Sequence, residues 1–81
     1  MILVEVSVPA LGHRYDFELE ESAPVELVLR EMVEVICQRE RLQAYAQQPF
    51  ALYGQDSATR LNPKGTLLQN GVHNGQKLLL L

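Results

Sequence analysis

The sequence predicts an α+β protein in which a single α-helix packs across one face of a mixed β-sheet. Three observations lead to this prediction. Two stretches near the beginning alternate apolar and polar residues, a central stretch repeats apolar residues at helical spacing, and the last four residues are all leucine. Because 81 residues have room for only one core, we expect one domain over residues 1–81.

The composition is that of an ordinary globular protein, with 47% hydrophobic and 21% charged residues. The net charge is −3 and the basic residues are scattered, so we expect no nucleic-acid partner, since such binding needs a concentrated positive surface. A lone cysteine, Cys37, excludes an intramolecular disulfide and suits a reducing compartment. The leucine run is far shorter than the ~20 apolar residues of a membrane-spanning helix. We therefore expect a cytoplasmic protein without direct membrane insertion.

The first two predicted strands form a hairpin. Ile2–Val8 alternates β-branched residues with other side chains, which is typical of a half-buried strand. A turn signal with Pro9 and Gly12 follows, and Tyr15–Leu19 then alternates apolar with acidic residues as a second strand.

A helix is predicted over Pro24–Arg39. Ser22 or Ala23 is the expected N-cap, and Pro24 lies in the first turn, where a missing N–H costs nothing. Apolar residues recur without a gap at helical spacing, which predicts a continuous buried stripe. The residues of this stripe are Val25, Val28, Leu29, Met32, Val33, Ile36 and Cys37.

The second half of the chain is expected to hold shorter elements. The polar segment 43–49 is a connection that could hold a short turn, and Phe50–Gly54 is a third strand. A short strand is expected around Thr59–Leu61. Next come one helical turn ended by Gly71 and a turn at Asn74-Gly75, before the final strand, Lys77–Leu81.

The final strand carries leucines on both faces and therefore belongs in the centre of the sheet, where both faces are covered. Placing it beside the first strand gives a mixed sheet of four to five strands wrapped on one helix. This arrangement is the β-grasp, the fold of ubiquitin.

With this order of elements, the sequence resembles a bacterial branch of the ubiquitin superfamily. The helix start "APVELVL" and the ending "TLLQNGVHNGQKLLLL" are similar to those of YukD/EsaB-like proteins, which are ubiquitin-fold components of the type VII (WXG100, ESX-like) secretion system. The resemblance spans the whole chain. It implies a cytoplasmic accessory protein that binds or regulates a membrane-embedded secretion apparatus, and it supplies no catalytic motif.

Conjugation and sulfur transfer by ubiquitin-like proteins both need a flexible C-terminal Gly-Gly. Because the sequence shows none beyond its last predicted strand, we expect no covalent conjugation through Leu81.

No group of residues predicts an enzyme, a cofactor or a metal site. Cys37 lies on the apolar helix stripe and is expected to be a buried hydrophobic residue. The two histidines fall in predicted turns without metal-ligand spacing. The remaining charged clusters are expected to be solvated surface: Glu18, Glu20 and Glu21, and Arg39, Arg41, Arg60 and Lys64.

One apolar surface does predict a function. If Leu78 and Leu80 face the helix, their neighbours in the strand face away from it, and strand parity puts further apolar residues on the same outer side. The predicted protein-binding patch consists of Leu3, Ala51, Tyr53, Leu79 and Leu81. The alternatives are that these are scattered surface residues or that the loop after Gly54 covers them.

The leading hypothesis is a non-conjugated adaptor of a type VII secretion system that binds a cytoplasmic domain of a membrane secretion component through this patch. A second copy of the chain is the alternative occupant, which would make a homodimer. A rival function is a small non-catalytic ubiquitin-like subunit of a multicomponent bacterial monooxygenase, and a module cut from a larger membrane protein is a third reading.

Overall fold

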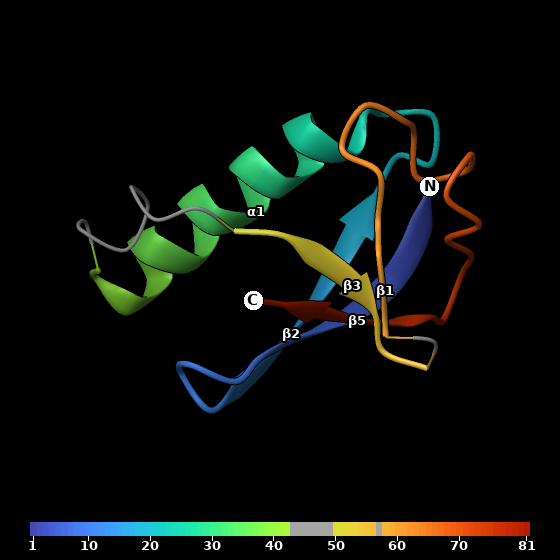
Figure 1. Cartoon of the computed structure of the whole chain (residues 1–81). Coiled ribbons are helices and arrows are strands. Elements are labelled where there is room, and N and C mark those ends of the chain that lie inside the picture. The colour runs from blue at the N-terminus through green and yellow to red at the C-terminus, as the bar shows by residue number, and fades with distance from the viewer. Residues whose placement is uncertain (43–49, 57) are drawn as a thin grey trace.

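The computed structural model describes residues 1–42, 50–56 and 58–81, so the predicted polar connection at 43–49 lies outside the described residues. Within them, one helix lies across one face of a five-stranded mixed sheet (Figure 1). The fold is a ubiquitin-like β-grasp, as predicted. Its elements are β1 (Ile2–Val8), β2 (His13–Leu19), α1 (Val25–Glu40), β3 (Leu52–Gly54), β4 (Thr59–Arg60) and β5 (Lys77–Leu80).

The leucine-rich strand β5 lies in the middle of the sheet, whose order is β2-β1-β5-β3-β4. It pairs parallel to β1, with Leu78 beside Val6, and antiparallel to β3, with Leu80 beside Leu52. The predicted central position is therefore confirmed. The described pairing continues past the end of β5, because the N–H groups of Ala51 and Leu81 each donate to the other residue's carbonyl oxygen, at 2.8 and 3.0 Å.

The hairpin of β1 and β2 is also confirmed, although β2 begins at His13, two residues earlier than predicted. The added length follows from the pairing, which runs without interruption from Ile2 opposite Leu19 to Val8 opposite His13. Gly12 takes a left-handed φ of 66° in the turn, a conformation that costs glycine little.

The start of α1 corrects one prediction. The N-cap is Pro24 rather than Ser22 or Ala23. Its backbone is extended, and its side chain forms no capping hydrogen bond. Backbone carbonyls of a distant segment do the capping: the N–H groups of Val25 and Glu26 donate to the oxygens of Gly65 and Pro63 at 2.9 and 3.1 Å. These bonds satisfy donors that every helix start leaves open, so no local capping side chain is needed.

The segment after β4 forms a hydrogen-bonded turn over residues 66–71. The Thr66 hydroxyl accepts the N–H of Gln69 at 3.0 Å, and the Gln69 side chain accepts the N–H of Thr66 at 2.9 Å. This reciprocal pair is a capping box, and Gly71 ends the turn with the predicted positive φ, 75°. The Asn74-Gly75 turn then attaches to β1, because Asn74 Oδ1 accepts the N–H of Leu3 at 2.8 Å.

The core lies between α1 and the sheet, where the inner residues of β1, β3 and β5 meet the helix stripe. The leucines of the last strand alternate as predicted: Leu78 and Leu80 are buried, Leu79 is half-buried and Leu81 is exposed. The buried apolar residues are Ile2, Val4, Val6, Val8, Val25, Val28, Met32, Val33, Ile36, Cys37, Leu52, Leu61, Leu67, Val72, Leu78 and Leu80.

A charge introduced at Met32 should unfold the protein. Met32 is only 1% exposed, so Met32→Asp would bury an unpaired carboxylate at a cost of several kcal/mol, against a total stability of roughly 5–15 kcal/mol. Val35→Asp is the matched control, since Val35 is 48% exposed on the same helix. Circular dichroism melts should show no folded baseline for the first variant and a midpoint within a few degrees of wild type for the second. Equal midpoints for the two variants would contradict this core assignment.

Candidate docking surface

The face of the sheet turned away from α1, here called the outer face, carries most of the predicted patch. Leu79 is the direct cross-strand neighbour of Tyr53 on β3, so the two side chains share this face. Ala51 and Leu81 form the adjacent hydrogen-bonded pair. Leu81 is 52% exposed, and the other three residues are half-buried. The structure thus brings together four of the five predicted patch residues, on the β3–β5 half of the sheet.

Leu3 is on the outer face but not in this group. Although Leu3 is 50% exposed, the β1 neighbour of Leu79 is Ser7, four residues further along the strand. At ~3.3 Å per residue, Leu3 lies roughly 13 Å from that position. Glu5 and its neighbour Lys77 occupy the same face in between, so a charged pair separates Leu3 from the apolar group.

Strand register places basic residues at both ends of the apolar group. Across the sheet, Arg14 pairs with Ser7, Ser7 with Leu79, Leu79 with Tyr53, and Tyr53 with Arg60. This cross-strand line of residues, here called the outer row, has an apolar and aromatic centre and an exposed arginine at each end. Tyrosine and arginine are enriched where proteins bind one another, so the outer row has the composition of a docking surface. Arg14 was not among the residues predicted for this patch, and Arg60 was predicted to be solvated surface.

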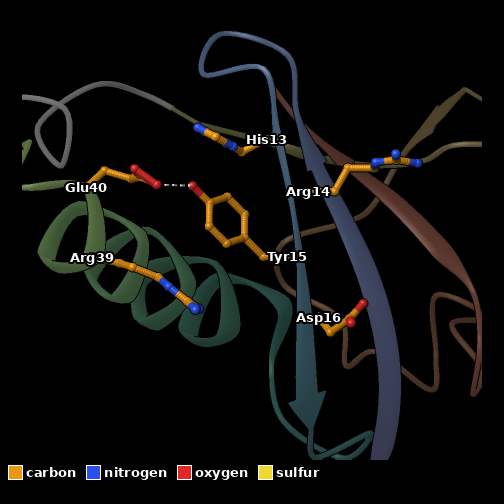
Figure 2. Close-up of a pocket in the computed structure, with 6 residues that line it drawn as sticks. All are labelled: His13, Arg14, Tyr15, Asp16, Arg39 and Glu40. Atoms are coloured by element: carbon orange, nitrogen blue, oxygen red, sulfur yellow. Dashed lines mark hydrogen bonds between the residues drawn. The ribbon is translucent and has the colours of Figure 1, made fainter.

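Apart from the outer row, a hollow of about 500 Å³ lies between β2 and the end of α1 and is lined mainly by polar side chains (Figure 2). Tyr15 donates a hydrogen bond to Glu40 Oε1 at 3.0 Å, which ties the strand to the helix. Figure 2 shows Arg14 and Asp16 pointing away from this pair, on the other side of β2. Because the charged groups do not converge on one point, the hollow offers no constellation for acid–base catalysis.

The remaining candidate residues lie apart from one another. His13 and His73 are exposed, and Glu20 accepts hydrogen bonds from the backbone and hydroxyl of Ser22. Glu21 lies 3.8 Å from the N-terminal ammonium group. Among the described residues, no group of three or more histidine, cysteine or acidic side chains could hold a metal ion.

Cys37 is a core residue, as predicted, with 6% of its surface exposed. Burial raises the pKa of the thiol, because removing water disfavours the thiolate. The cysteine therefore stays neutral at physiological pH and is a poor nucleophile.

In the part of the chain that the structure describes, no helix combines the length and hydrophobicity that a membrane crossing requires.

Comparison with known families identifies the class of protein. The family described as "WXG100 protein secretion system (Wss), protein YukD" matches residues 3–80. The chain therefore belongs to the YukD family of the WXG100, or type VII, secretion system, and it is a ubiquitin-like protein associated with that system. Among curated proteins, none matches the chain in sequence.

Solved structures of type VII secretion proteins share the fold. The ubiquitin-like domain of EccD5 from Mycobacterium xenopi superposes with a TM-score of 0.78 at 21% identity, covering 99% of this chain and 91% of that one. The ubiquitin-like domain of the Mycobacterium tuberculosis type VII secretion protein ECCD1 gives 0.70 at 21% identity, with 100% and 99% coverage. A chain of the MycP5-free ESX-5 inner membrane complex gives 0.78 at 22% identity, with 99% of this chain matching 20% of that one. At these identities the likeness shows the fold alone.

The thiol of Cys37 should be dispensable. Cys37→Ala removes one buried sulfur and should lower the free energy of unfolding by about 1 kcal/mol without loss of function. In the native protein, a thiol-specific colorimetric reagent should react with Cys37 only slowly, and it should react fully once guanidinium chloride unfolds the chain. Rapid modification of the native thiol would count against this prediction, as would a Cys37→Ala variant that folds normally but is inactive in the cell.

Proposed function

We propose that this protein is a non-catalytic, non-conjugated ubiquitin-like adaptor of a type VII secretion system, working in the cytoplasm through the outer row. The observation that carries the proposal is the line of Leu79 and Tyr53 between Arg14 and Arg60 on an exposed sheet face. Membership of the YukD family supports the assignment to a type VII secretion system. The rival hypothesis, a subunit of a multicomponent monooxygenase, gains no support from that membership.

The chemistry of the outer row indicates what its partner presents. Leu79 and Tyr53 favour an apolar partner surface, because burying them removes apolar area from water. The guanidinium groups of Arg14 and Arg60 favour carboxylates on either side of that surface, with which arginine forms paired hydrogen bonds. Lys77, two residues before Leu79 on β5, lies on the same face, but its cross-strand neighbour Glu5 offsets its charge.

We propose that the partner is a cytoplasmic domain of a membrane component of the secretion system. Support comes from the solved structures: ubiquitin-like domains of similar fold belong to type VII secretion proteins, and one lies within an inner membrane complex. A separate chain with this fold could occupy the equivalent position by binding instead of covalent linkage. The proposal needs no cofactor and no metal.

A binding assay against purified cytoplasmic domains of the cognate membrane components tests the proposal. One domain should bind the full chain, and Leu81→Asp should weaken that binding by about tenfold or more, since it places a charge in the apolar group that adjoins the outer row, where Leu81 pairs with Ala51. Arg60→Glu should also weaken binding, and the affinity difference from wild type should shrink as salt rises.

Leu68→Asp is the matched control, because Leu68 is 65% exposed but lies in the 66–71 turn, outside the sheet. All three variants should melt within a few degrees of wild type. Unchanged binding by Leu81→Asp and Arg60→Glu, or equal loss with Leu68→Asp, would rule out the outer row as the docking surface.

A further inference from the structure

The strand β2 lies at one edge of the sheet and pairs, among the described residues, with β1 only. Alternate backbone N–H and C=O groups of such a strand point outward, where another strand can pair with them. Proteins usually protect long edges with charged side chains, lysine above all, or with proline, a bulge or a very short strand. The charges of β2 at Arg14, Asp16 and Glu18 lie on one side of the strand, and the side toward the helix is mainly apolar. The other edge, β4, is only two residues long, whereas β2 has seven residues in unbroken register and contains neither lysine nor proline.

An apolar groove runs beside this open edge. It has a volume of about 180 Å³ and lies between β2 and α1. Phe17 and Leu19 form its strand wall, and Val28, Met32 and Val35 form its helix wall. Val35 is 48% exposed, and Leu27, two turns earlier on the same helix ridge, is 41% exposed. The groove, here called the β2 groove, therefore has an apolar floor open to solvent directly beside the edge of β2 that no other described strand pairs with.

The rim of the β2 groove is acidic. Glu18 on β2 and Glu31 on α1 line it, and neither forms an ion pair with a described residue. Asp16 and Glu20, like Glu18, are exposed and belong to the side of β2 turned away from the helix. A segment lying along this edge would meet apolar side chains on the helix side and carboxylates on the outer side.

We propose that β2 and its groove bind an extended segment of a partner protein as an added strand, and that this segment alternates apolar and basic residues. Its backbone pairs with the outward groups of β2, and its apolar side chains enter the groove against Phe17 and Val35. Its basic side chains lie beside Asp16 and Glu18, as favourable cross-strand pairs. This surface shares Arg14 with the outer row and is otherwise separate from it, and its remaining charged residues are acidic.

A second copy of this chain is a poor occupant of the same edge. Antiparallel pairing of two β2 strands about Glu18, the register that aligns the two grooves, would place Glu18 opposite Glu18 and Asp16 opposite Glu20 of the other copy. Like charges across paired strands are destabilising. The acidic edge thus selects against self-pairing and in favour of a basic strand.

The test titrates the full chain, labelled with nitrogen-15, with a blocked peptide of alternating valine and lysine about eight residues long. We expect saturable amide shift changes along β2 and on the groove side of α1. Three control peptides isolate the causes. One alternates valine with glutamate, one has the first composition with its valines and lysines grouped, and one carries N-methyl groups on the amides that would face β2. Each should bind about tenfold or more weakly than the alternating peptide.

Variants of the chain locate the site. Val35→Asn and Glu18→Lys should each weaken peptide binding about fivefold or more, while Leu81→Asp, in the apolar group that adjoins the outer row, should leave it unchanged. Failure of the proposed function through the outer row can therefore be distinguished from failure of strand binding at β2. Equal binding by the grouped or N-methylated peptide would overturn the proposal. So would shift changes confined to the outer row, or the absence of shifts in β2 at peptide concentrations of about 2 mM.

Discussion

The placement of β5 between β1 and β3 is the constraint on which the rest of the structure depends. Backbone pairing on both sides fixes which way each leucine of the strand points. Leu78 and Leu80 are thereby buried under α1, where they complete a core that no other strand could fill from the centre of the sheet. The same pairing places Leu79 on the outer face, because neighbouring side chains of a strand point to opposite faces. The stability of the core and the proposed binding surface thus both depend on β5, because side chains alternate in direction along this strand.

The two proposed docking surfaces, the outer row and the β2 groove, differ in charge. The outer row is apolar with arginines at its ends, and the groove is apolar with carboxylates at its rim. A basic segment that suits the groove suits the arginine ends of the outer row poorly, so the two proposed surfaces favour different segments. The adaptor that we propose, which would hold two parts of a secretion apparatus together, needs two such surfaces.

Much of the fold could be predicted because its signals are local. Alternating side chains in Ile2–Val8 identify a strand, and apolar residues at helical spacing from Val25 to Cys37 identify a helix. Each signal lies within one short segment of the sequence. The N-cap at Pro24 could not be predicted, since its partners, Pro63 and Gly65, lie about forty residues away in the sequence. The proposed docking surface could be predicted only in part, because its residues too are brought together by pairing between distant segments. Parity puts Leu3 on the correct face, but only the register between β1 and β5 shows that it is displaced from Leu79 and that Arg14 lies in the row.

Leu78 and Leu80 belong to the core, and we propose that Leu79 and Leu81 belong to a free binding surface. The most direct measurement is the relaxation that a soluble paramagnetic probe causes in the leucine methyl signals, with and without the secretion component that binds. In the free protein, the methyls of Leu78 and Leu80 should be shielded and those of Leu79 and Leu81 should relax strongly, and binding should then shield the outer pair. Shielding of Leu79 and Leu81 already in the free protein, or no change in them on binding, would contradict the account.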